Sequence, residues 1–167
     1  MVGTKIVIAG SGPELDRLQA LAAAHRLNNV VFAQQVTEAE KVSLLERCTA
    51  LVLPSHLRSE AFGMVLVEAA MFGKPTISCE IGTGTSYVNL GGETGLVVSP
   101  EDPAALAQAM RQLAADLPLT TAFGLAARER YSSHFSGEVM GRSYAKLYRE
   151  VVLPAAAGQR SAIESRP

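Results

Sequence analysis

Short apolar runs alternate with stretches of helical periodicity along this chain of 167 residues. The apolar runs are short and bounded by turn residues, as in buried strands, while the stretches between them repeat apolar residues at helical spacing. Strands separated by helices of about ten to fifteen residues favour right-handed crossovers and a parallel sheet covered on both faces. We therefore predict an α/β fold with a Rossmann-like, doubly wound parallel sheet, whose strands lie at 5–9, 30–32, 50–53, 76–79 and 95–98.

The helices between these strands carry their own start and stop signals. Thr37 and Glu40 have the spacing of a capping box, which opens a helix. Gly73 can adopt the left-handed conformation that ends a helix, and Pro75 prevents its continuation. The pair at 102–103 combines an aspartate N-cap with proline at the first helical position.

The last third of the chain, 118–152, has helical periodicity throughout. We expect one domain over residues 1–152 and a disordered tail over 153–167, which is rich in Ala, Ser, Gly and Arg. The aromatic residues of this region are interpreted as packing anchors, namely Tyr131, Phe135, Tyr144 and Tyr148.

Composition excludes several classes of function. The chain is 48% hydrophobic and 19% charged with a net charge of −1, which suits one globular core and offers no basic surface for a nucleic acid.

Cys48 and Cys79 have no CxxC spacing, so we expect free, buried thiols in a reducing compartment. The three histidines have no metal-ligand spacing, so we predict no metal site. No run reaches the ~20 apolar residues that cross a bilayer, so we expect a cytoplasmic protein, at most peripheral to the inner face of a membrane.

Two carboxylates, Glu60 and Glu68, follow the strand that ends before Pro54. We expect both on one helix, separated by about two turns and roughly 80° around its axis. The free amides of the helix start would then stand between two acceptors suited to hydroxyl groups. A positive helix end suits phosphate and carboxylates suit sugar, so this arrangement predicts a nucleotide-sugar site.

The turn after the first strand, with Gly10 and Gly12, invites a dinucleotide-binding interpretation. That fingerprint needs a third glycine and an acidic residue about twenty positions further on, where the chain has 32–34, Phe-Ala-Gln. We therefore reject NAD and predict no cofactor. Ligands of parallel sheets bind outside the carboxyl ends of the strands, so we expect Gly10, Gly82 and Glu60 to line one crevice, of which the turn with Gly10 and Gly12 forms a wall.

The Glu60–Glu68 segment resembles the Glu-x7-Glu element of retaining glycosyltransferases with the GT-B fold, the class called glycosyltransferase family 4, group 1. The resemblance implies the C-terminal, donor-binding half of a GT-B enzyme, without its first strand–helix unit and without the acceptor-binding N-terminal domain. It follows the family's order through the segments 5–13, 30–32, 54–55, 73–75 and 95–102.

By this resemblance Glu60 would be the catalytic residue, binding hydroxyls of the donor sugar, and Glu68 would bind the ribose hydroxyls. Arg58, two residues before Glu60, could face the diphosphate. Backbone amides at the helix start and the turn after the second strand would complete the donor site, with the residues Phe62, Gly63, Met64, Val65, Gln35 and Val36.

One departure narrows the resemblance further. Where many relatives have Gly-Gly-x-x-Glu, this chain has Tyr87 in the place of the acid. In this respect it resembles bacterial mannosyl- and rhamnosyltransferases that build the O-antigen of lipopolysaccharide. The resemblance implies a GDP- or UDP-sugar donor and favours a GDP-linked mannose or rhamnose. The implied reaction is retaining transfer to a saccharide or lipid-linked acceptor, and the fragment alone should be inactive.

Two other classes stay open at this point. A non-catalytic, flavodoxin-like nucleotide-binding or regulatory module would share the alternating pattern, although receiver-like modules need acids where this chain has Gly10, Gln34 and Pro54. A sugar-nucleotide epimerase or a phosphorylase relative with the GT-B fold would differ only in donor chemistry.

Overall fold

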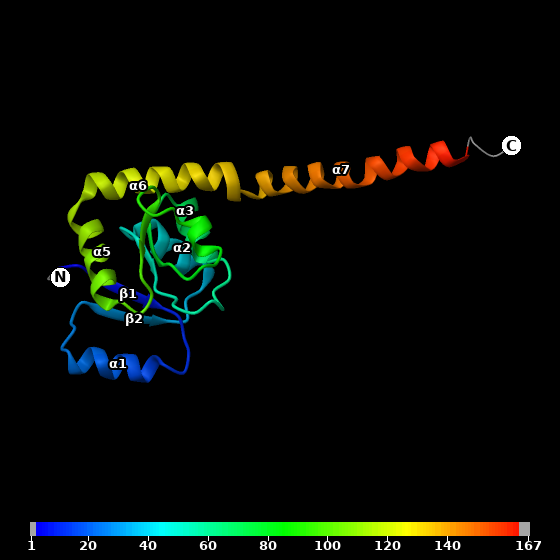
Figure 1. Ribbon diagram of the computed structural model, residues 1–167. Helices are drawn as coiled ribbons and strands as arrows, with labels where there is room; N and C mark the ends of the chain where they lie inside the picture. The colour runs from blue at the N-terminus through cyan, green and yellow to red at the C-terminus, as the bar shows by residue number, and fades with distance from the viewer. Residues whose placement is uncertain (1–2, 164–167) are drawn as a thin grey trace.

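The computed structural model describes residues 3–163, and from residue 153 onward only the backbone is described. Strands alternate with helices up to residue 115, and helices alone follow (Figure 1). The elements are β1 (Ile6–Ala9), α1 (Leu15–Ala24), β2 (Val30–Gln34), α2 (Glu38–Arg47), β3 (Leu51–Leu53), α3 (Met64–Met71), β4 (Thr76–Cys79), α4 (Thr85–Val88), β5 (Gly95–Val98), α5 (Pro103–Ala115), α6 (Leu117–Arg130), the π-helical turn η1 (Tyr131–Phe135) and α7 (Gly137–Ile163). The predicted α/β fold is confirmed.

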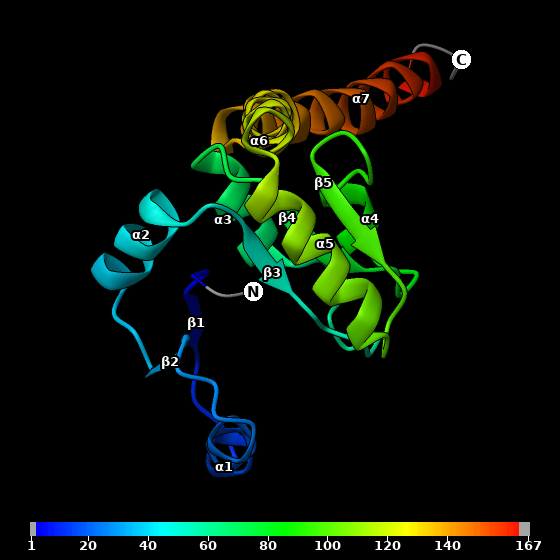
Figure 2. The ribbon, with the colours of Figure 1, turned by 90° about the vertical axis from the view of Figure 1, so that its left-hand side faces the viewer.

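The strands form two parallel sheets rather than the single predicted sheet. β1 pairs with β2, and β3, β4 and β5 pair in chain order. Figure 2 shows β1 and β3 apart, and over residues 3–163 no strand joins them. The predicted single sheet is therefore divided between β2 and β3 over the described residues.

Helices cover both faces of the three-stranded sheet, as a doubly wound fold requires. On one face Ile77 of β4 packs with Leu113 of α5 and Phe123 of α6, which are almost fully buried. On the other face Leu66 of α3 packs with Val88 of α4. Successive side chains of a strand point to opposite faces, so short apolar strands supply both layers of the core.

The N-terminal strand–helix–strand unit has no comparable core. Among residues 3–44 no residue is buried, and the first buried residue along the chain is Leu45. Val7 and Ile8 of β1 are each 38% exposed, although their side chains are typical of a buried strand. Figure 1 shows α1 on the outer side of the β1–β2 pair. This unit is therefore packed on one side at most.

The predicted helix caps are present. The Thr37 hydroxyl accepts a hydrogen bond from the Glu40 amide at 3.3 Å, and the Glu40 carboxylate accepts one from the Thr37 amide at 2.8 Å. The bond from the Thr37 amide, followed by the bond that the Thr37 hydroxyl donates to the same carboxylate oxygen at 2.8 Å, lowers the pKa of Glu40. The Asp102 carboxylate likewise accepts from the Ala105 amide at 2.9 Å, and Gly73 follows α3 with φ 65°.

Replacing Thr37 by alanine should lower the free energy of unfolding by about 1 kcal/mol, because the Glu40 amide then loses its acceptor. Urea denaturation checks this value. Thr121→Ala, at an exposed position inside α6, is the matched control and should change stability by no more than about 0.5 kcal/mol. Equal effects of the two changes would contradict a capping role for Thr37.

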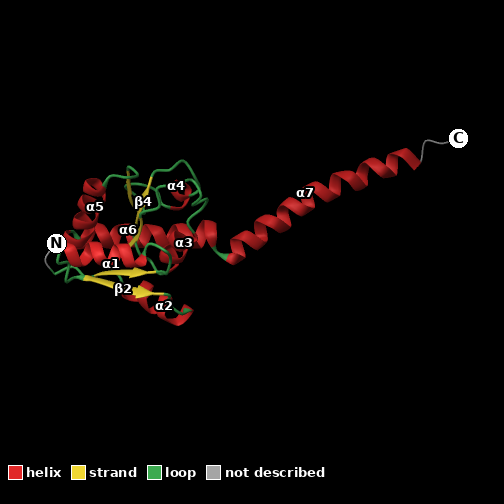
Figure 3. Cartoon of the chain, turned by 90° about the horizontal axis from the view of Figure 1, so that it is seen from below, coloured by secondary structure: helices red, strands yellow, loops and turns green. Residues whose placement is uncertain are grey.

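The C-terminal helix α7 leaves the body of the molecule, as Figure 3 shows. Tyr131 and Phe135 pack against the α3 side of the core, as predicted. Tyr144 and Tyr148 are 58% and 67% exposed, so their interpretation as packing anchors was wrong. Helical periodicity reveals that one face is apolar but not that the helix lies beyond the core.

The tail predicted over 153–167 falls partly on α7, whose backbone continues to Ile163. Alanine, which is frequent in this stretch, is the residue that most favours helix. Residues 164–167 of the predicted tail lie outside the described residues.

Candidate donor-binding site

The loop between β3 and α3 carries Glu60 at the carboxyl end of the sheet. The sequence predicted that Glu60 lies on the helix. This prediction was wrong, because α3 begins only at Met64. Gly63 precedes the helix with a φ of 80°, a conformation that favours glycine and ends the loop. A Cβ there would lie 2.8 Å from Cδ1 of Leu66. The expected angle of 80° between two carboxylates on one helix therefore does not apply.

Glu60 is held against the start of α3. Its Oε1 accepts a hydrogen bond from the Gly63 amide at 3.0 Å. The next amides, those of Met64 and Val65, donate no hydrogen bond within the described residues, as expected in the first turn of a helix. A carboxylate thus stands beside free amides at the positive end of a helix dipole.

A hollow of about 300 Å³ lies beside this carboxylate. Four of its five lining residues have polar or charged side chains, and the lining consists of Ser55, His56, Leu57, Ser59 and Glu60. A larger hollow, of about 460 Å³, includes Cys48, Gly73 and Lys74. These residues precede β3 and β4, so this larger hollow lies at the opposite ends of the strands and is not the candidate site.

The loop between β4 and α4 closes against the same region. The Gly84 amide donates to the Ala61 carbonyl at 2.9 Å, and a Cβ on Gly84 would lie only 2.6 Å from the Phe62 ring. A Cβ on Gly82 would lie 3.1 Å from Nη1 of Arg58. The structure therefore brings the Arg58 guanidinium against the β4–α4 loop, near the start of α3.

Glu80, which sequence reasoning did not single out, begins this second loop. Its carboxylate accepts from the Ser86 hydroxyl at 2.7 Å and from the Gly82 amide at 3.0 Å. These two bonds, the Ser86 bond first, lower the pKa of Glu80. The carboxylate shapes the turn that contacts Arg58. No sequence motif marks this role.

An aromatic cluster joins both loops to the C-terminal helices. The Phe135 ring of η1 meets Phe62 edge-on at 6.2 Å and Tyr87 at 5.7 Å between ring centroids. The Arg130 guanidinium lies 5.1 Å from the Tyr87 centroid and donates to the Val88 carbonyl. The predicted packing role of Phe135 is confirmed, whereas Arg130 was missed because its partners lie more than forty residues away.

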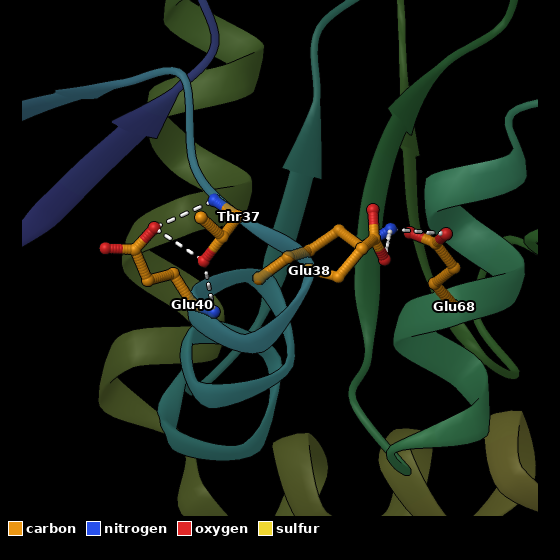
Figure 4. Close-up of polar contacts among 5 residues, drawn as sticks. Thr37, Glu38, Glu40 and Glu68 are labelled. Atoms are coloured by element: carbon orange, nitrogen blue, oxygen red, sulfur yellow. Dashed lines mark hydrogen bonds and ion pairs between the residues drawn. The ribbon is translucent and has the colours of Figure 1, made fainter.

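Glu68 lies against α2 and does not line the hollow beside Glu60. Its Oε1 accepts from Nζ of Lys41 at 2.9 Å, and the same ammonium pairs with Oε2 of Glu38 at 2.9 Å (Figure 4). The bonds to Glu38 and then to Glu68 raise the pKa of Lys41. No sequence motif signals this partner, because it is 27 residues away.

The other predicted residues lie in loops at the carboxyl ends of β1 and β2. The amide of Gly10, whose φ is 141°, donates a hydrogen bond to the backbone carbonyl of Gln34 at 2.7 Å. Gly12 is exposed. Gln35 is exposed and Val36 is half-buried just before α2. The structure does not bring these four loop residues to the hollow beside Glu60.

The part of the chain that the structure describes contains no group of three or more His, Cys, Asp or Glu side chains placed to hold a metal ion. Among its helices, none combines the length and apolarity that crossing a membrane requires.

Comparison with known proteins shows the relationships of the chain. The family model described as "Glycosyl transferases group 1" matches residues 2–130. A D-rhamnosyltransferase, WbpZ, of Pseudomonas aeruginosa is 53% identical over 131 residues, which are 78% of this chain and 34% of the relative. The O-antigen chain mannosyltransferase C of Escherichia coli is 41% identical over 86% of this chain and 38% of its own length.

The structure of a sucrose-phosphate synthase from Thermosynechococcus elongatus superposes with a TM-score of 0.79 at 28% identity, over 90% of this chain and 39% of the synthase. The chain thus spans little more than a third of the proteins that it matches. Since the family model covers more than half of its residues, the chain belongs to the family of glycosyl transferases group 1.

Proposed function

We propose that this chain is the donor-binding part of a glycosyltransferase that takes a glycosyl unit from a nucleoside-diphosphate sugar. The observation that carries the proposal is the pair of free amides at Met64 and Val65 beside the Glu60 carboxylate. Amides at a helix start suit phosphate oxygens, and a carboxylate suits sugar hydroxyls. Both kinds of group stand at the carboxyl end of β3, where parallel sheets bind ligands.

The donor of this proposal is a GDP-linked mannose or rhamnose, and the acceptor is a saccharide or a lipid-linked saccharide of the O-antigen type. Two relatives named for rhamnosyl and mannosyl transfer support this choice of sugar. The acceptor would be bound by polypeptide outside this sequence, since the relatives are more than twice as long as the region they share with it. A lipid-linked acceptor would bring the whole enzyme to the inner face of a membrane.

In this proposal Glu60 holds the donor sugar for retaining transfer. Its Oε1 is occupied by the Gly63 amide, which fixes the carboxylate and leaves Oε2 for sugar hydroxyls. As the bond to the sugar breaks, negative charge develops on the diphosphate. The free amides of α3 and the Arg58 guanidinium would stabilise that charge, and fixed donors of this kind need no reorganisation during the reaction.

Glu68 binds the ribose hydroxyls in the same proposal, with Lys41 as a positioning residue. The ammonium holds Oε1 at 2.9 Å, so Oε2 is left to accept from the ligand. Gln35 and Val36 immediately precede α2, which carries Lys41, so the loop proposed to cradle the base is continuous with the helix that orients Glu68.

Exchanging each carboxylate for its amide tests this division of roles. Glu68→Gln should weaken both GDP and GDP-mannose, whereas Glu60→Gln should weaken GDP-mannose only, each by about 10- to 150-fold. This range corresponds to the roughly 1.5–3 kcal/mol of a hydrogen bond to a charged group. Ligand-observed NMR suits the weak affinity expected of the chain alone, on the order of high micromolar to millimolar.

Glu129→Gln, on an exposed part of α6, is the matched control and should leave both affinities unchanged. UDP and UDP-glucose in the same series report the preference for the base. Equal weakening of GDP by the changes at Glu60 and Glu68 would contradict the assigned roles, and equal binding of the UDP ligands would contradict the GDP assignment.

A further inference from the structure

The larger hollow, of about 460 Å³, lies at the ends of β3 and β4 that are opposite to Glu60. Three segments that are far apart in the sequence enclose it, namely the chain just after α2, the turn between α3 and β4, and α6. Its volume falls within the roughly 300–1,000 Å³ that is typical of small-molecule sites. The donor site does not use this hollow, so its side chains need their own explanation.

Two glycines let α6 approach the turn between α3 and β4 closely. A Cβ on Gly124 of α6 would lie 2.4 Å from the Gly73 carbonyl oxygen, so the helix and the turn meet backbone to backbone. A Cβ on Gly73 would lie 3.7 Å from Cβ of Arg128. This packing places Arg128 of α6 beside the turn that carries Lys74, and both residues line the hollow.

The lining of the hollow carries two positive charges and no negative charge. Lys74 and Arg128 belong to it, whereas no aspartate or glutamate does. Among the described residues, neither cation takes part in an ion pair. The chain as a whole has 16 acidic and 15 basic residues, so the positive charge of this hollow is a local feature.

Both cations have donors suited to an anion. Nζ of Lys74 donates to the Glu46 carbonyl, near the end of α2, at 2.8 Å. An ammonium has three donors, so two remain after this bond, which holds the half-buried Lys74 in place. The exposed Arg128 offers a planar fork of donors that matches the oxygens of a phosphate. The pair therefore favours phosphate over a neutral ligand.

An apolar surface borders the two cations. Leu117 and Leu125 of α6 line the hollow and are 70% and 69% exposed, and the exposed Thr121 lies between them on the same helix face. These side chains can cover a carbon skeleton, and the Thr121 hydroxyl can bond to a hydroxyl group. The chemistry of the hollow thus has a charged part and a part suited to a short, hydroxylated carbon chain.

We infer that this hollow is a second ligand site, which binds a small phosphate monoester between Lys74 and Arg128. The carbon skeleton of the ligand lies against Leu117 and Leu125. A small molecule fits better than a membrane surface, because Lys74 is half-buried in a recess and a flat surface reaches protruding groups. The inference does not depend on the proposed sugar donor, since the two sites lie at opposite ends of the strands.

Glycerol 3-phosphate is the probe that tests the site. We titrate it into the chain and follow the amides by two-dimensional NMR, with glycerol as the neutral control. The amides of Gly73, Lys74 and Arg128 should shift and saturate, with a dissociation constant on the order of millimolar. Glycerol should leave them unchanged, because it lacks the charge that the two cations recognise.

Three substitutions locate the binding. Lys74→Gln and Arg128→Gln should each weaken glycerol 3-phosphate at least about tenfold, because each removes charge-assisted hydrogen bonds. Arg111→Gln is the matched control, since Arg111 is exposed on α5 and does not line the hollow. It should leave the affinity unchanged. Equal weakening by all three changes would show general attraction to positive charge and would overturn the inference.

Cys48 gives a second, independent readout. Its half-buried thiol lines the hollow, and burial raises its pKa while the positive charge of Lys74 acts in the opposite direction. Saturating glycerol 3-phosphate should slow alkylation of Cys48 by iodoacetamide at least about fivefold, because the ligand covers the thiol and neutralises the charge that favours the thiolate. The buried Cys79 should stay unmodified throughout, which shows that the chain remains folded.

Two further outcomes would overturn the inference. One is an unchanged alkylation rate together with NMR shifts that do not saturate. The other is binding to vesicles of phosphatidylglycerol with no response to glycerol 3-phosphate, since the surface would then recognise a membrane rather than a small phosphate monoester.

Discussion

Replacing Gly95 by alanine should abolish stable folding of the three-stranded half of the molecule. A Cβ at this position would lie 2.0 Å from the Thr76 carbonyl oxygen, 2.8 Å from the Thr76 nitrogen and 2.7 Å from Oδ1 of Asn89. Two of these atoms belong to the backbone of β4, so β4 and β5 would have to separate. Overpacking by a methyl group costs about 1–3 kcal/mol where side chains can move, and here the cost should exceed about 3 kcal/mol.

Urea denaturation and the dispersion of the amide NMR spectrum measure this effect. A loss above about 3 kcal/mol is a large fraction of the 5–15 kcal/mol that stabilises a typical domain. Gly137→Ala is the matched control, because a Cβ there meets nothing within 4 Å and the position opens α7. A Gly95→Ala protein as stable as the control would show that β4 and β5 do not pair as the structure has them.

Replacing Asn89 by leucine should lower the free energy of unfolding by about 2–5 kcal/mol. The side chain is 1% exposed and its Nδ2 donates to the Ser78 hydroxyl at 2.9 Å and the Leu96 carbonyl at 3.0 Å. Its Oδ1 accepts from the Thr94 hydroxyl at 3.1 Å. Leucine has a similar shape but no polar atoms, so it leaves buried groups of β4 and β5 unpaired, at about 1–3 kcal/mol each.

Thermal and urea unfolding give the magnitude of this loss. Asn28→Leu, at an exposed turn, is the same substitution outside the core and should change stability by no more than about 0.5 kcal/mol. If Asn89→Leu changes the free energy of unfolding by no more than that amount, the hydrogen bonds of the Asn89 side chain contribute little to stability.

Local chemistry made much of the fold predictable from the sequence. The capping box at Thr37, the aspartate cap at Asp102 and the end of α3 at Gly73 depend on residues within a few positions of one another. The strands from β3 to β5 were predictable because short apolar runs bounded by turn residues suit burial on both faces. These elements were placed correctly to within about two residues.

The features that the sequence did not predict depend on the backbone conformation of one loop and on contacts between residues far apart in the chain. Glu60 was expected on the helix, but Gly63 starts the helix late because its left-handed backbone suits a loop. The Lys41–Glu68 pair and the Arg130–Tyr87 contact join positions 27 and 43 residues apart, beyond the range of any periodicity. The division into two sheets depends on strand edges, which no local pattern encodes.

The chain order of β3, β4 and β5 also has a kinetic consequence. Leu51 pairs with Thr76, and Thr76 pairs with Gly95, so each parallel pairing closes only one short crossover. Folding rates rise as the sequence separation between contacting residues falls, because short loops lose less entropy on closure. This half of the molecule can therefore form quickly and serve as a nucleus.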